Sequence, residues 1–220
     1  MGEHTFHMLP TSTITRRLLV PIAFLLGTTS ILAQQGNRFG LKGGVGWSNL
    51  RGEGEDVSDK DVRTAFHGGV FGRISPNDHL AVQAELLYAQ KGTKVTYDGL
   101  IDQEVTFKLS YLELPVFVVI GVGEVLELHA GVYAAYLLSS KVSSEGDLGS
   151  GEDELDRDNF QGADYGLLLG TGFNLGPAQI GLRYAHGLAE LAASDGAQLL
   201  LGTARNSNLQ LYLAIALNGK

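Results

Sequence analysis

The sequence predicts an all-β fold: an eight-stranded antiparallel up-and-down transmembrane β-barrel formed by residues 34–220. Three observations predict it. Apolar residues alternate with small or polar residues in eight segments, and a period of two is typical of strands with one apolar face. The connections between these segments are alternately long and short. Aromatic residues gather near the ends of the segments, on their apolar face.

The first four predicted strands cover 39–48, 65–74, 80–90 and 111–120. In each of them apolar residues recur at every second position, interrupted by glycine in the first two segments. The residues between are mostly small or polar in the first three segments, and the fourth has Tyr111, Glu113, Pro115 and Phe117 there. The apolar faces are Phe39, Leu41, Val45 and Trp47; Phe66, Val70 and Ile74; Leu80, Val82, Leu86 and Tyr88; and Leu112, Leu114, Val116, Val118 and Ile120. This alternation places successive side chains on opposite faces of a sheet.

The last four predicted strands cover 126–138, 165–175, 179–188 and 209–217 and continue the same pattern. The segment 209–217 shows it most clearly, because five leucine and isoleucine residues from Leu209 to Leu217 alternate with Gln210, Tyr212 and two alanines. We expect strands of roughly 9–12 residues, a length that crosses a bilayer when the strand is tilted.

The connections favour a barrel over a sandwich. Long ones cover 49–64, 91–103, 139–162 and 189–206, and short ones cover 75–79, 121–124 and 176–177. Strict alternation of short turns and long loops is typical of an up-and-down barrel whose long loops lie on the outer side of the membrane.

Aromatic placement fits the same topology. The residues expected near the outer end of their strands are Trp47, Tyr88, Tyr136, Tyr165 and Tyr184, and those expected near the opposite end are Phe39 and Phe173. Such rings prefer the boundary between hydrocarbon and headgroups. We therefore expect two aromatic girdles around an aliphatic band.

Composition excludes several classes of function. The chain has no cysteine, which excludes thiol catalysis, disulfides and Cys-based zinc sites. Residues 1–33 contain Arg16 and Arg17, then an apolar stretch from Leu18 to Ala33, and this order predicts a cleaved signal peptide rather than a membrane anchor. The net charge of the whole chain is −8, and an acidic chain is a poor nucleic-acid binder.

The less apolar face of the strands is expected to line the barrel interior. It is rich in glycine, alanine, glutamine and serine and carries few charges, unlike a water-facing exterior. Buried charges need partners. We therefore expect a polar network in the lumen, formed by Lys42, Arg73, Glu85, Glu113, Glu127, His129 and Arg183.

Three strings carry a resemblance to a known family: "GLKGG" at 40–44, "ELLYAQKG" at 85–92 and "YLELP" at 111–115. Over residues 39–217 the chain resembles the outer-membrane β-barrel proteins grouped under the label "porin family". The resemblance implies an eight-stranded barrel in a Gram-negative outer membrane, with no common activity. The partners it implies are membrane lipid, lipopolysaccharide and the barrel-insertion machinery. We expect a monomer. The chain ends in "LAIALNGK", without the usual terminal aromatic residue.

No catalytic motif accompanies this pattern. There is no G-x-S-x-G nucleophile elbow, and we expect neither an enzyme nor a cofactor. The acidic segment 143–160 carries seven carboxylates, but their spacing does not fit a calcium loop, and a solvated loop is the favoured interpretation. We expect a structural or surface-recognition role with a largely plugged lumen. A narrow channel and a secreted lipocalin-like carrier are the alternatives.

The segment "SYLELPVFVVIG" at 110–121 gives two local predictions. Val105, Phe107 and Leu109 have the opposite parity to Leu112 and the strand that follows, which predicts a β-bulge near 109–111. Glu113 should then face the lumen, with Arg183 or Lys42 as its partner. Pro115 lacks the N–H that a ladder needs, so we expect a local break in the sheet there.

Overall fold

A computed structural model describes residues 37–51, 60–61, 63–97, 103–146, 151–154, 161–190 and 204–218. Ten strands lie in these ranges. They are β1 (Arg38–Arg51), β2 (Lys60–Asp61), β3 (Arg63–Asn77), β4 (Leu80–Tyr97), β5 (Gln103–Val122), β6 (Leu126–Gly146), β7 (Gly151–Glu154), β8 (Ala163–Leu175), β9 (Ala178–Glu190) and β10 (Arg205–Ala216). The described part of the chain contains no helix long and apolar enough to cross a membrane.

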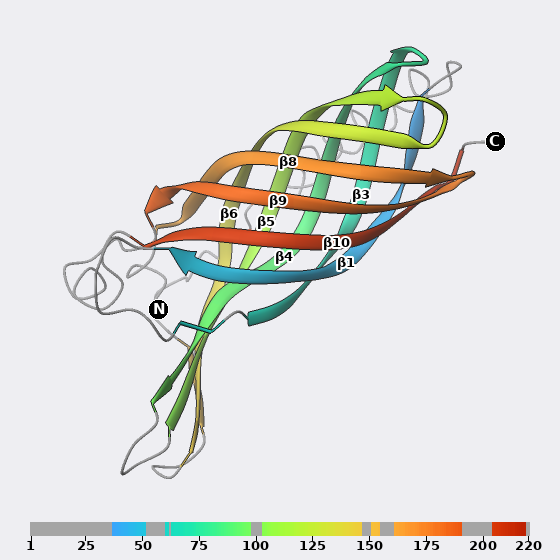
Figure 1. Cartoon of the computed structure of the whole chain (residues 1–220). Helices are drawn as coiled ribbons and strands as arrows, with labels where there is room; N and C mark the ends of the chain where they lie inside the picture. The colour runs from blue at the N-terminus through green and yellow to red at the C-terminus, as the bar shows by residue number, and fades with distance from the viewer. Residues whose placement is uncertain are drawn as a thin grey trace, which may run out of the picture.

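Eight of these strands close into an antiparallel barrel, which confirms the predicted fold class (Figure 1). The order is β4-β3-β1-β10-β9-β8-β6-β5, and β5 pairs again with β4. Two short strands add to the sheet outside this order: β2 pairs with β4, and β7 pairs with β6. Closure leaves the eight main strands without a free edge, which is the condition for spanning a membrane with strands.

The register fixes how strongly the strands tilt. Paired residues followed once around the barrel lead from Arg38 back to β1 at Ser48, a displacement of ten residues. For eight strands this stagger corresponds to a tilt of roughly 40° and to an interior wide enough only for packed side chains. The stagger of ten residues thus sets the width of the lumen.

The short connections are tight turns at one end of the barrel. Gly123 and Gly176 have φ angles of 70° and 69° in two of them, a conformation that glycine adopts without steric cost. The long connections join strands at the opposite end. We call these two ends the turn side and the loop side.

Several strands are longer than expected. β4, β5 and β6 have 18, 20 and 21 residues, far beyond the predicted 9–12. The strands β1, β3, β8 and β9 exceed that length by one to three residues, and only β10, with 12, lies within it among the eight barrel strands. Residues 91–97 continue β4 instead of starting a loop, because they pair with β5 from Lys91↔Leu109 to Tyr97↔Gln103. Figure 1 shows that these strands extend past the others on the loop side.

Of the two local predictions for β5, the bulge is confirmed, and the break at Pro115 is present on one side of the strand only. The pairing of β5 with β6 shifts between Ser110 and Tyr111, which confirms the bulge. At Pro115 the break is one-sided. On the β4 side, Val116 pairs with Ala84 and Glu113 pairs with Leu87, but Leu114 and Pro115 have no partner. The register is the same before and after this gap. On the β6 side Pro115 still pairs with Tyr133.

Candidate functional site in the barrel interior

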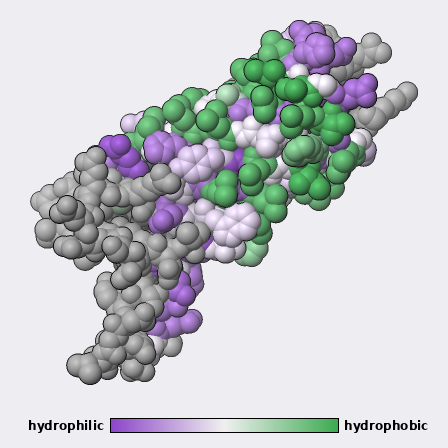
Figure 2. All heavy atoms as spheres, in the orientation of Figure 1, coloured by the Kyte–Doolittle hydropathy of each residue, from purple (hydrophilic) through white to green (hydrophobic). Residues whose placement is uncertain are grey.

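The outer wall of the barrel is apolar. Most of the large apolar side chains on the outward positions are between 38% and 64% exposed. On the face that Figure 2 shows, hydrophobic residues cover the wall and hydrophilic residues lie toward the ends. Such a wall is costly in water and favourable in lipid. The alternation therefore resolves into an apolar outside and a polar inside.

The predicted girdle residues all lie on this outer wall. Trp47, Tyr88, Tyr136, Tyr165, Phe39 and Phe173 are exposed, and Tyr184 is half-buried. On the loop side four of them lie in register on alternate strands. Leu112 lies between Tyr88 and Tyr136 in the sheet, and Leu209 lies between Trp47 and Tyr184.

The interior holds a central cluster, which consists of Lys42, Glu85 and Arg183. The Lys42 Nζ atom lies 2.9 Å from Glu85 Oε2, and Arg183 donates to both carboxylate oxygens of Glu85 at 2.7 and 3.0 Å. All three side chains are at most 1% exposed. The ring of Tyr212 lies 3.8 Å from Lys42 Nζ, and the ring of Phe117 lies 4.5 Å from the guanidinium of Arg183.

A turn-side cluster surrounds Glu127. Arg73 donates to its two oxygens at 2.7 and 2.9 Å, a bidentate arrangement that is among the strong ones. The remaining partners of this carboxylate are Asn174, Gln179 and His129, at 2.7, 2.7 and 3.3 Å. Gln83 accepts from Arg73 and donates to Glu85 and so connects this cluster to the central one.

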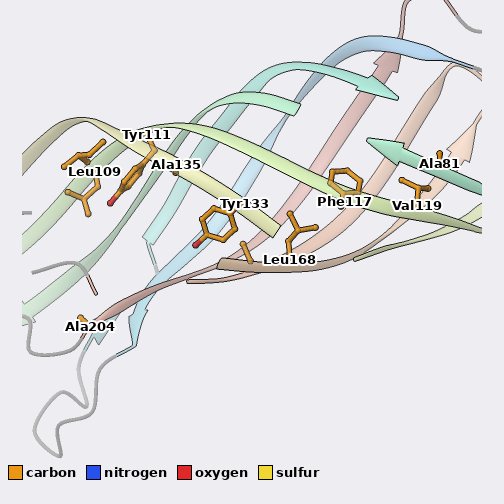
Figure 3. Packing of buried hydrophobic residues seen from close by; sticks show 11 residues of the cluster. Ala81, Leu109, Tyr111, Phe117, Val119, Tyr133, Ala135, Leu168 and Ala204 are labelled. Atoms are coloured by element: carbon orange, nitrogen blue, oxygen red, sulfur yellow. The ribbon is translucent and has the colours of Figure 1, made fainter. Parts of the chain in front are cut away.

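A loop-side cluster is built on Lys91. Its Nζ atom lies 2.7 Å from Glu113 Oε2 and 3.1 Å from Asp164 Oδ2, and 4.2 Å from the ring centre of Tyr133. Asn206 donates to Asp164 at 2.9 Å. Figure 3 shows Tyr133 with Tyr111 and Phe117 among the buried side chains of the barrel. The ring centre of Tyr111 lies 5.3 Å from Lys91 Nζ.

The prediction that Glu113 pairs with Arg183 or Lys42 is therefore wrong. Glu113 contacts Lys91, not Arg183 or Lys42, because Glu85 already occupies those two cations. Neither Lys91 nor Asp164 was among the predicted network residues. The sequence places Lys91 in a predicted loop. It nevertheless keeps the parity of Glu85, six residues earlier on the same strand, and that parity is the signal that identifies it as inward-facing.

All seven predicted network residues are buried, and the structure brings them into these three clusters. With Lys91 and Asp164 added, four cationic side chains face four carboxylates. Balanced, paired charges are what a buried polar interior requires. His67 is buried as well and belongs to none of the clusters.

A cavity of about 460 Å³ opens on the turn side. Its lining includes Arg38, Arg73, Asp78, His79 and Glu127. The cavity therefore reaches the turn-side cluster, where Arg73 and Glu127 are tied to each other.

The described residues contain no group of three or more His, Asp or Glu side chains placed to hold a metal ion. Most of the acidic segment 143–160 lies outside the described residues or in strand residues whose side chains are not described, and its interpretation stays a prediction. So does the signal peptide, because residues 1–33 lie outside them too.

A closed barrel with an apolar wall and a charged, paired interior defines a transmembrane β-barrel protein. Residues 32–193 match the family model described as "Outer membrane protein beta-barrel domain", which is most of the chain. The protein belongs to this family, and its place is the outer membrane.

Three solved structures of bacterial proteins are similar to this chain at low identity. Ail, the attachment invasion locus protein of Yersinia pestis, is 16% identical, with a TM-score of 0.43 over 83% of this chain and 99% of Ail. Neisserial surface protein A is 14% identical, with a TM-score of 0.47 over 82% of this chain and 99% of that protein. OprG of Pseudomonas aeruginosa is 13% identical, with a TM-score of 0.33 over 83% and 91%. No curated protein matches the sequence.

Proposed function

We propose that this outer-membrane barrel has a structural or surface-recognition role and that its lumen is plugged by side chains. One observation carries the proposal: the eight charged side chains of the three clusters are each at most 10% exposed. An ion that crosses the barrel would have to separate the buried, hydrogen-bonded ion pairs of these clusters. Separating such a pair costs several kcal/mol.

The recognition surface in this proposal is the loop side. It carries the four long connections and the extensions of β4, β5 and β6, and outer loops are where barrels of this kind vary and bind. The partners we propose are lipid and lipopolysaccharide around the wall and the insertion machinery during assembly, with the barrel acting as a monomer and not as an enzyme.

A narrow channel is the second candidate, and the cavity on the turn side favours it. That cavity reaches Arg73 and Glu127 from one end, so opening the clusters beyond it would complete a path. The lipocalin-like carrier does not fit, because its interior should be apolar and its exterior polar. This barrel has the reverse arrangement.

Conductance in planar lipid bilayers separates the two candidates. We expect the purified, refolded protein to give no stable conducting events, while its unboiled form runs faster than the boiled form on a gel and so proves to be folded. Stable events whose ion selectivity changes in the Glu113→Gln variant would overturn the plugged lumen and establish the channel.

A further inference from the structure

The section of the lumen between the central and loop-side clusters is lined by polar side chains. On β10, Tyr212 lies against the central cluster and Asn206 donates to Asp164 of the loop-side cluster. Gln210 and Asn208 lie between them on the inward face, 0% and 2% exposed. His67 enters the same section from β3, where it pairs with Ala89, a residue between Glu85 and Lys91 on β4.

These polar side chains have atoms without partners. Within the described part of the chain, no hydrogen bond reaches Gln210 Nε2 or Oε1, Asn208 Oδ1, or His67 Nε2. The Nε atom of Arg183, which borders the section, also lacks a partner there. Most of the unpartnered buried side-chain atoms of the described residues therefore lie in one layer of the barrel.

The wall of this layer is built from small residues. The inward positions beside the polar side chains are Ala65, Ala89 and Ala185, all buried. His67 and Asn208 lie over glycines: a Cβ added at Gly44 would lie 2.7 Å from His67 Cε1, and one at Gly46 would lie 2.6 Å from Asn208 Oδ1. Alanine and glycine thus leave space for the polar side chains, which larger residues at these positions would fill.

A dry arrangement of these atoms would be expensive. Each buried donor or acceptor left unpaired lowers the ratio of folded to unfolded protein by roughly 5- to 150-fold. Several in one layer would lower it by more than a domain of ordinary stability tolerates. Buried polar groups without protein partners are normally satisfied by ordered water.

We propose that this layer binds ordered water molecules, held by His67, Asn208 and Gln210. The mixture of atoms points to water rather than an ion. A cation would face Arg183 and Lys42, and an anion would face amide oxygens and Glu85, whereas water both donates and accepts. The proposal rests on the plugged lumen of the proposed function and makes the plug hydrated in one section.

Two glutamines provide a matched test. Gln210 and Gln83 are both buried, but Gln83 has protein partners on both sides of its amide, whereas the Gln210 amide has none in the described structure. We expect Gln210→Met, like Gln83→Met, to lower the folded-to-unfolded ratio in a urea titration by roughly 5-fold or more. An unchanged or higher ratio for Gln210→Met would overturn the proposal, because removing a dry unpaired amide relieves its cost.

Nuclear magnetic resonance of the wild-type barrel in lipid vesicles tests the same point without a substitution. Cross-peaks between water protons and the side-chain amide of Gln210, stronger than those of Gln83, are expected. Their absence would overturn the proposal even if the variants fail to fold. The bilayer measurement is separate: conducting events would refute the plugged lumen, and missing water contacts in a silent barrel would refute only the hydrated layer.

Discussion

The substitution Lys91→Met tests the buried network most directly. Lys91 is fully buried and is the cation between two carboxylates, Glu113 and Asp164, at 2.7 and 3.1 Å. Methionine keeps the length and much of the apolar volume of the side chain but removes the charge. Both carboxylates would then remain in the interior without a cation in contact.

The expected loss is large. Removing one partner of a buried ion pair costs about 3–5 kcal/mol, because the other partner is left uncompensated. Lys91 also lies 4.2 Å from the ring centre of Tyr133, and that attraction adds about 1 kcal/mol. We expect a decrease of about 5 kcal/mol in the free energy of unfolding, roughly several thousandfold in the folding equilibrium constant.

The matched control is Lys94→Met on the same strand. Lys94 pairs with Glu104, but these side chains are 36% and 35% exposed, and exposed pairs contribute about 0–1 kcal/mol. Both variants can be refolded into lipid vesicles and titrated with urea. The sole tryptophan, Trp47, is on the outer wall, so its fluorescence reports insertion, and the mobility of the unboiled protein on a gel reports folding independently.

The refuting result is a Lys91→Met barrel within about 1 kcal/mol of Lys94→Met. A triple variant distinguishes charge from packing: adding Glu113→Gln and Asp164→Asn to Lys91→Met removes the unpaired charges. We expect this variant to regain at least half of the loss. If it regains nothing, the effect of Lys91 comes from packing alone.

Three further outcomes follow from the same structure, each measured by urea titration in vesicles. Glu85→Gln leaves two buried cations without their carboxylate and should cost about 3–5 kcal/mol; a loss below 1 kcal/mol would contradict the central cluster. Gly131→Ala should cost about 1–3 kcal/mol, because its Cβ would lie 2.3 Å from a backbone oxygen of β5. Gly72→Ala has nothing within 4 Å of the added Cβ and should stabilise by about 0.5–1 kcal/mol, so equal effects of the two glycines would refute this geometry. Pro115→Ala restores an N–H where pairing with β4 is interrupted and should leave stability unchanged or raise it by about 1 kcal/mol; a clear loss would show that the proline is required there.

Much of the fold could be read from the sequence because barrel strands follow a simple rule. Each residue faces lipid or lumen, and the two faces differ in polarity. The parity of Leu112 and Glu113 therefore predicted their directions, and the change of parity upstream predicted the bulge between Ser110 and Tyr111.

The partners inside the lumen could not be read in the same way. Parity says that Glu113 points inward but not which cation it meets, because that depends on the stagger between distant strands. Glu113 and Lys91 lie on paired strands, whereas Arg183 and Glu85, 98 residues apart, meet across the barrel. The ends of the strands were also misjudged, because residues such as Lys91 look like loop residues until their parity is followed.

The sequence by itself determined the number of strands in the barrel, their order and the face of most side chains in the predicted strands, since these depend on local alternation and on connection lengths. The tertiary structure decided how the charges pair, because a displacement of ten residues around eight strands sets which inward side chains share a level. It also decided which polar groups are left without a protein partner. Those groups, around Gln210, depend on a register that no single strand contains.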